Sequence, residues 1–354
     1  MHIAGTFSSA ITLGNKLFSR YNSRLYGMEE SVRIFFYWYN FMRPRYLKLY
    51  ETGELQKRID KSWKMMQCCT ICPKNCKVDR ISGNLGVCGV GKLAPVSSYG
   101  PHFGEERPLV GQNGSGTIFF ASCNLLCIFC QNYDISHFNE ADSRHLTNED
   151  LAAVMIRLQQ QGCHNINLVT PSHVVPHILG ALPEAIENGL KLPLVYNSSG
   201  YDSVETLNLL DGVIDMYMPD FKFWDNATAD LYTEAHNYSD IARQAIKTMY
   251  AQVGNLSMDD QDIAQRGLLI RHLVMPDHLN ETREILKFIA TEISSTCHVN
   301  IMDQYRPCGT AVSPIDRPLS NKEYQTALDF AKPTGLIQLN EMRLADLLRN
   351  LSRL

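Results

Sequence analysis

The distribution of cysteines constrains this chain more than any other feature of its sequence. Eight of the eleven cysteines fall between positions 68 and 130, in two groups with mostly short spacings. Disulfide-rich scaffolds are usually small secreted domains, whereas this chain has 354 residues and no clear signal peptide. Closely spaced cysteines in such a chain indicate metal binding rather than disulfide bonds.

Composition limits the classes of partner. Hydrophobic residues make up 45% of the chain, and 33 Lys and Arg against 37 Asp and Glu give a net charge of −4. This balance gives no electrostatic case for nucleic acid. No apolar run approaches the ~18 residues that a membrane span needs. We expect a cytoplasmic protein that binds neither nucleic acid nor membrane. A mitochondrial or related organellar location is the alternative, because residues 1–28 are basic and lack acids.

Short apolar runs alternate with helical patterns from residue 116 onward, which predicts an α/β fold with a parallel sheet. Such a sheet is either open and doubly wound or curled into a barrel. The expected strands are Gly116–Ser122, Ile166–Thr170, Leu192–Asn197, Ile214–Met218, Leu268–Met275 and Val299–Asp303. The expected helices are 43–66, Asn148–Gln161 (capped by Thr147 with Asp150), Glu281–Ser294 and Asn321–Ala331.

Four segments describe the expected organisation. Residues 1–42 form an N-terminal extension, and residues 43–110 contain a helix that runs into a cysteine-rich metal-binding segment. Residues 111–341 hold the βα units, and residues 342–354 form a C-terminal helix or tail.

The second cysteine group directly follows the first expected strand and reads C-x3-C-x2-C, with Cys123, Cys127 and Cys130. Three thiolates can hold three irons of a [4Fe–4S] cube and leave the fourth iron open to a substrate. Two alternatives stay open: a zinc site completed by His137, or three unrelated buried thiols.

This motif, with Phe129 before the third cysteine, resembles the signature of the radical S-adenosylmethionine superfamily. More narrowly, the chain is similar to the PflX-like group, homologues of pyruvate formate-lyase activating enzyme. The resemblance covers roughly residues 43–341. It rests on the following stretches: 69–88, 99–102, 104–106, 121–132, 165–173, 196–202, 219–223, 271–276 and 303–309.

The resemblance implies a partial (β/α)6 barrel and an oxidoreductase with a [4Fe–4S] cluster and S-adenosylmethionine. The cluster would reductively cleave this cofactor to methionine and a 5′-deoxyadenosyl radical, which abstracts a hydrogen atom. The substrate is either a glycyl radical enzyme, as for the activating enzymes, or an unidentified small molecule. Flavodoxin or ferredoxin would donate the electron. The competing hypothesis is a non-catalytic binding protein stabilised by metal.

Polar residues at the expected strand ends supply the predicted cofactor contacts. These are Phe129, Asn132, Thr170, Ser172, Asn197, Ser199, Asp220, Lys222 and Arg271. Thr170-Pro171-Ser172 stands where many radical enzymes have Gly-Gly-Glu, and Ser172 is alternatively a helix cap. Asp220-Phe221-Lys222 is similar to the Asp-Leu-Lys of the activating enzymes, and a structural ion pair between Asp220 and Lys222 is the alternative. Arg271 needs an anion, either the cofactor or Asp220. Lone histidines are expected in the core or on the surface, and His173 is the best exception, because it stands at a strand end beside the expected cofactor site.

The first cysteine group comprises Cys69, Cys72, Cys76 and Cys88, with Cys68 as an alternative to Cys69. Four thiolates suit a closed structural zinc site or an electron-relay iron–sulfur cluster, and the absence of metal is the third alternative. Arg80 and Lys74 lie beside the thiolates, although a solvated loop is the simpler interpretation of both.

Overall fold

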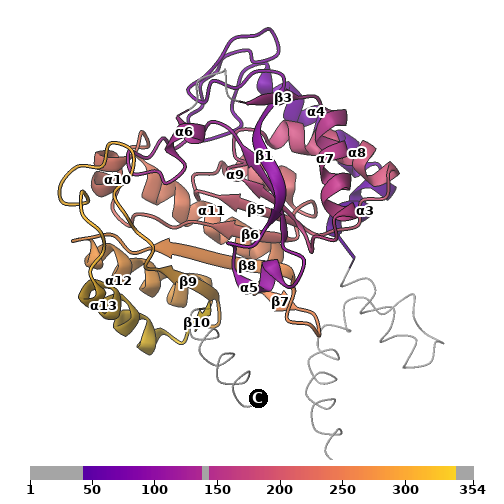
Figure 1. Cartoon of the computed structure of the whole chain (residues 1–354). Helices are drawn as coiled ribbons and strands as arrows, with labels where there is room; N and C mark the ends of the chain where they lie inside the picture. Colours follow the sequence, from indigo (N-terminus) through magenta and orange to yellow (C-terminus); the bar gives the residue numbers. More distant parts are fainter. Residues whose placement is uncertain (1–42, 138–142, 340–354) are drawn as a thin grey trace, which may run out of the picture. The chain divides into compact units, whose positions relative to one another are not determined.

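Six parallel strands form the centre of the sheet in a computed structural model, which describes residues 43–137 and 143–339 (Figure 1). Their spatial order follows the chain: β2 (Ser115–Phe120), β4 (Ile166–Val169), β5 (Leu194–Ser198), β6 (Met216–Pro219), β8 (Ala264–Leu273) and β9 (His298–Met302). Each falls within or overlaps one of the six predicted strands. The α/β prediction is therefore confirmed.

The helices between these strands lie on one face of the sheet. Parallel strands in chain order with right-handed crossovers place every connecting helix on the same side, which curls the sheet like a barrel wall. These helices are α7 (Asn148–Gln160), α8 (Val175–Glu187), α9 (Val204–Leu210), α10 (Asn226–Tyr232), α11 (Tyr238–Val253) and α12 (Leu279–Phe288). The sheet ends in β3 (Arg144–Leu146) on one side and β10 (Ile337–Gln338) on the other, so the barrel is partial.

Strand alternation separates an outer from an inner core. Leu194 and Tyr196 of β5 pack in the larger core with the helices. Val195 packs instead with Met216 and Met218 of β6 in a second cluster. Leu109, from α5 (Arg107–Val110), joins this second cluster and fills the inside of the curved sheet.

The region before β2 differs from the prediction. Strand β1 (Ala94–His102) pairs antiparallel with β2 and with β3, so residues on both sides of the expected boundary at 110 share one sheet. The predicted helix 43–66 is two helices, α3 (Arg45–Glu51) and α4 (Glu54–Met66). Gly53 separates them with φ 71°, a left-handed conformation that glycine adopts readily.

The remaining helices agree with the prediction apart from their ends. Thr147 and Asp150 form the expected capping box of α7. The predicted 281–294 helix is α12, continued by a π-helix over Ile289–Ile293. Short elements complete the fold: α6 (Tyr133–Ser136), β7 (Ser257–Met258), α13 (Asn321–Ala331) and a 3-10 turn at Lys332–Thr334. The predicted segments 1–42 and 342–354 lie outside the described residues.

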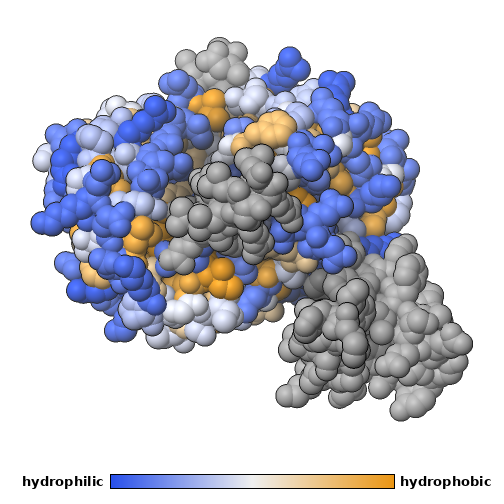
Figure 2. Space-filling view, turned by 60° about the horizontal axis from the view of Figure 1, so that its bottom comes forward, coloured by the Kyte–Doolittle hydropathy of each residue, from blue (hydrophilic) through white to orange (hydrophobic). Residues whose placement is uncertain are grey.

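Hydrophilic residues cover most of the face shown in Figure 2, and hydrophobic residues form separate patches on it. Within the described ranges, no helix combines the length and apolar character needed to cross a membrane.

Candidate functional site

The loop after β2 carries the three motif cysteines, and segments from across the fold hold it in place. The Ser122 N–H donates to the Ile135 carbonyl at 2.6 Å. The Ile128 N–H donates to Tyr232, at the end of α10, at 3.0 Å, and the Ile128 carbonyl accepts from the Thr310 N–H at 2.8 Å. The loop is therefore fixed at the carboxyl ends of the strands, on the side where α6 and α10 lie (Figure 1).

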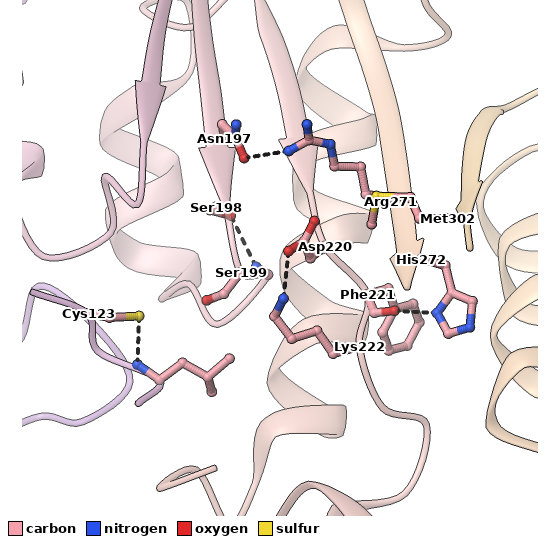
Figure 3. Close-up of polar contacts among 12 residues, drawn as sticks. Cys123, Asn197, Ser198, Ser199, Asp220, Phe221, Lys222, Arg271, His272 and Met302 are labelled. Carbon is pink, nitrogen blue, oxygen red and sulfur yellow. Dashed lines mark hydrogen bonds and ion pairs between the residues drawn. The ribbon is translucent and has the colours of Figure 1, made fainter. Parts of the chain in front are cut away.

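Two residues of this loop adopt the left-handed conformation without being glycine. Ser122 has φ 69° and Leu126 has φ 52°. Such residues persist where the surrounding structure enforces them, often at functional sites. Between them, the Cys123 sulfur accepts a hydrogen bond from the Leu125 N–H at 3.4 Å (Figure 3). The conformation of the loop thus directs a backbone N–H group toward the sulfur of Cys123.

The three motif thiols lie close enough to interact electrostatically. Burial raises the pKa of Cys123 and of Cys127, whereas Lys222 opposes the increase. Cys130 adds to both shifts, and Cys123 adds to that of Cys127. Deprotonating Cys123 and Cys127 together therefore requires a strong positive charge nearby, which iron or zinc supplies.

The described parts of the chain contain no three Cys, His, Asp or Glu side chains arranged around a position for one metal ion. A [4Fe–4S] cube is wider than one ion, so its ligand sulfurs stand farther apart. The predicted zinc alternative with His137 finds no support, since His137 stacks on Tyr133 at 3.9 Å and contacts the Ser136 hydroxyl at 3.0 Å.

Asp220 and Lys222 form an ion pair of 2.6 Å beside these thiols (Figure 3). Burial alone would lower the pKa of Lys222, but Asp220 and Cys127 hold it above its usual range. The second oxygen of Asp220, Oδ1, is buried and has no hydrogen-bond partner among the described residues. An unpaired carboxylate oxygen of this kind is costly and marks a place for a donor.

Arg271 binds two protein carboxylates that the site prediction missed. Its Nε and Nη2 donate to Glu106 at 2.8 and 3.2 Å, and Nη2 also donates to Glu105 at 2.5 Å. Its Nη1 donates to Asn197 at 3.2 Å (Figure 3). Asn300 donates to Glu106 at 2.7 Å. Asp220 also interacts electrostatically with Arg271, so the predicted partner Asp220 is joined by two further carboxylates, and a contact of Arg271 with the cofactor stays a prediction.

The two carboxylates differ in their protonation behaviour. Burial would raise the pKa of Glu106, but Arg271 and Asn300 hold it below its usual range. The pKa of Glu105 is raised, because burial and the charge of Glu106 outweigh the attraction of Arg271. Arg271 therefore stabilises the ionised form of Glu106 strongly and that of Glu105 only in part.

Ser172 does not cap α8, whereas Thr170 directly follows β4, as predicted. Helix α8 starts after Val174, so Ser172 is not its cap. Ser172 is buried and bonds to the buried Asp202, which also accepts from Ser198 at 2.6 Å. Thr170, at the end of β4, is left-handed with φ 58° and only partly buried.

Other predicted residues lie in the surroundings of the site. Phe129 is buried in an aromatic cluster, with ring centroids 5.9 Å from Phe223 and 6.4 Å from Tyr232. Asn132 is exposed at the start of α6. The Ser199 carbonyl accepts from the Tyr238 hydroxyl at 2.9 Å, which fixes the turn after β5. Of these three residues, Ser199 is the one placed beside Asp220 in Figure 3.

Two buried histidines bond to backbone carbonyls. His173 bonds to the Ala121 carbonyl at 3.0 Å, and His272 bonds to the Phe221 carbonyl at 2.8 Å (Figure 3). Burial lowers the pKa of both to about 4, so they are neutral near pH 7.

Comparison with known proteins places the chain in a family. No family model matches it. The uncharacterized protein MJ0674 of Methanocaldococcus jannaschii is 34% identical over 303 residues, which cover 84% of this chain and 81% of that protein. The chain belongs to the MJ0674 family. Because MJ0674 is itself uncharacterized, the activity of the MJ0674 family has to be inferred from the site.

Solved structures show a partial likeness to this MJ0674-family chain. Native anSMEcpe with bound AdoMet is 9% identical, with a TM-score of 0.44 over 60% of this chain and 57% of that one. Streptococcus suis SuiB bound to S-adenosylmethionine is 12% identical, with a TM-score of 0.40 over 62% and 48%. SuiB bound to its precursor peptide SuiA gives 11% and 0.42 over 62% and 46%. The chain spans about half the length of these proteins.

Proposed function

We propose that this chain is a radical S-adenosylmethionine enzyme in which Cys123, Cys127 and Cys130 bind a [4Fe–4S] cluster. One observation carries the proposal: the three thiols converge at the strand ends beside the Asp220–Lys222 pair. Three thiolates leave one iron open, and the adjacent pair offers both charges that the methionine part of the cofactor requires. The C-x3-C-x2-C motif and its resemblance to the superfamily support the same assignment.

The residues present fit the cofactor. Asp220 Oδ1 is a buried acceptor without a partner in the described residues, and an ammonium group would satisfy it. Lys222 lies near Cys127 and is placed to bind a carboxylate. Bound S-adenosylmethionine would supply a 5′-deoxyadenosyl radical upon reductive cleavage. The chain's own residues orient the cofactor and exclude water.

The other predicted contacts divide by position. Thr170 and Ser199 follow β4 and β5 at the edge that carries the cysteines, and we keep both as cofactor contacts. We propose that Asn197 and Arg271 support Asp220, because Arg271 lies beside Asp220 on the neighbouring strand and is held by Asn197 and the two carboxylates. Phe129 and Ser172 support the loops from the core, and Asn132 lies outside this group of contacts.

The decisive experiment counts metal and product in one sample. Protein purified without oxygen is assayed for iron, sulfide and zinc, then mixed with reductant and S-adenosylmethionine, and 5′-deoxyadenosine is measured. We expect at least about four irons per chain, together with product. Zinc without iron, and no product after cluster reconstitution, would show that the cysteines only stabilise the fold.

Replacing Lys222 with Met is expected to weaken S-adenosylmethionine binding by roughly 10- to 100-fold, since a hydrogen bond to a charged group contributes about 1.5–3 kcal/mol. Equilibrium dialysis of the reconstituted protein measures the change. Lys247→Met is the matched control, because this lysine pairs with Glu292 on the surface, with both side chains about half exposed. An unchanged dissociation constant for Lys222→Met would remove this residue from the binding site.

We propose that the substrate is a glycyl radical enzyme. We propose reduced flavodoxin or ferredoxin as the electron donor. The resemblance to activating enzymes supports this, and a partial barrel leaves room for a peptide loop at its mouth. Mixing the reduced protein and S-adenosylmethionine with pyruvate formate-lyase tests it by electron paramagnetic resonance. A glycyl radical signal is expected. Cofactor cleavage without that signal would favour a small-molecule substrate.

A further inference from the structure

The first cysteine group forms a folded knuckle between α4 and β1. The Cys69 N–H donates to Val78 at 2.9 Å, and the Lys77 N–H donates back to Cys69 at 3.0 Å, so the chain reverses between them. The reversal brings Cys76 toward Cys69 and Cys72. Cys72 interacts electrostatically with the other three thiols of the group, which therefore share one location.

Cys88 lies near the other three thiols because the chain turns back toward them at residues 86–89. A Cβ atom on Gly86 would lie 2.9 Å from the Cys76 sulfur, so the glycine leaves space for that thiol. The Gly89 N–H then donates to the Gly86 carbonyl at 2.9 Å and turns the chain around Cys88. Burial raises the pKa of Cys72 and of Cys88, and backbone N–H groups that bond to the two sulfurs oppose part of this increase.

Arg80 lies against these sulfurs and is 1% exposed. The expectation of a solvated loop at this residue is therefore wrong, because neighbouring segments cover it. Its Nη1 lies 3.8 Å from the Cys69 sulfur and 3.0 Å from the His173 carbonyl, and Nη2 lies 3.4 Å from the Gly91 carbonyl. Within residues 43–137 and 143–339 no carboxylate pairs with it, and its Nε has no partner.

A buried guanidinium without an anion is unfavourable, since it keeps its charge at any ordinary pH. Neutral thiols do not compensate it. Because no three of these side chains surround a position for a single metal ion in the described residues, we infer that Cys69, Cys72, Cys76 and Cys88 hold an anionic iron–sulfur cluster, with Arg80 as its buried counter-charge. An iron–sulfur cluster bound by four thiolates carries a net negative charge, which a guanidinium offsets. The four thiol protons pass to solvent when the centre forms.

The same segment also supports the catalytic loop. The Ser122 hydroxyl, next to Cys123, bonds to the Cys88 carbonyl. Arg80 bonds to the His173 carbonyl, and the His173 ring bonds to Ala121, which precedes Ser122. Arg80 is therefore linked to the motif loop through His173, although the inference itself does not depend on the proposed activity.

Removal of the motif ligands isolates this centre. In a Cys123→Ala/Cys127→Ala/Cys130→Ala variant, reconstituted with iron and sulfide or with zinc, any bound metal belongs to the first group. We expect about four irons per chain, with matching sulfide. Zinc bound in place of iron would overturn the assignment of a cluster. Addition of Cys72→Ala should remove the metal. A folded triple variant that holds neither metal would overturn the inference, whatever the activity of the wild type.

The counter-charge is tested by Arg80→Met in the same background. We expect loss of the metal to a chelator to be at least roughly tenfold faster than from the parent. Lys77→Met is the matched control, because it removes a charge next to Cys76 but from an exposed residue. Equal rates for the two variants would overturn the role of Arg80.

A second variant tests the same centre if Arg80→Met does not fold. Gly86→Ala pushes against the Cys76 sulfur and should also accelerate metal loss, whereas Gly100→Ala, whose added Cβ would meet nothing within 4 Å, should not. Retention of metal by Gly86→Ala at the parent rate would argue against Cys76 as a ligand.

Discussion

Replacement of Cys127 with Ala is expected to abolish 5′-deoxyadenosine formation. Cys127 is buried, interacts with both other motif thiols and adjoins Lys222. Two thiolates are too few to hold a cube whose open iron must be precisely placed. Product should fall to the level of a sample without protein, while iron bound to the motif is lost. Anaerobic assays with excess reductant and S-adenosylmethionine measure both.

Cys163→Ala is the matched control for this variant. Cys163 is equally buried but lies before β4, at the opposite end of the strands from the motif loop. It should keep its motif iron and its product, with at most a small loss of stability from the smaller side chain. A Cys127→Ala protein that still cleaves the cofactor would refute the proposed ligand set.

The sequence was sufficient to predict the strands and the edge at which the site lies. Strands buried on both faces read as apolar runs, so polar residues such as Asp220 and Lys222 at their ends stand out. The carboxyl ends of parallel strands meet at one edge, and this geometry brings the motif loop beside Asp220 without further information. The capping box of α7 was predictable for a similar reason, because Thr147 and Asp150 are only three positions apart in the sequence.

The partners of Arg271 and Arg80 were not predictable in this way. Glu105 and Glu106 lie 166 and 165 positions before Arg271, and their approach depends on β1, an antiparallel strand without a clear apolar run. Arg80 lies in a loop rich in glycine and charged residues, which is typical of exposed chain. Its burial arises from contacts with His173 and Gly91, which only the tertiary structure reveals.

Both arginines follow the same physical rule. Each carries a permanent positive charge in the interior and needs a negative charge nearby, and the sequence composition does not identify that partner. Arg271 is paired with the carboxylates of Glu105 and Glu106. Arg80 finds carbonyl oxygens and a thiol, and we therefore assign its missing anion to metal-bound thiolates.

Replacement of Arg271 with Met is expected to destabilise the holoprotein by about 3–5 kcal/mol near neutral pH, because two buried carboxylates lose their counter-charge. In the wild type the pKa of Glu106 is lowered, so its contribution is present above its unfolded pKa and is lost as the pH falls. In the variant both carboxylates should have raised pKa values. Its folded state then gains protons as the pH falls and recovers stability. The difference between wild type and variant should therefore narrow from pH 8 toward pH 5.

Urea unfolding at several pH values measures this difference, with Arg157→Met as the control. Arg157 is exposed and donates to the Tyr99 hydroxyl at 2.9 Å, so its loss should cost little at any pH. Adding Glu105→Gln and Glu106→Gln to Arg271→Met should recover part of the stability at pH 8, because neutral amides are cheaper to bury than unpaired carboxylates. A cost that is independent of pH, or unchanged by the two amides, would mean that Arg271 stabilises the barrel by packing rather than by charge.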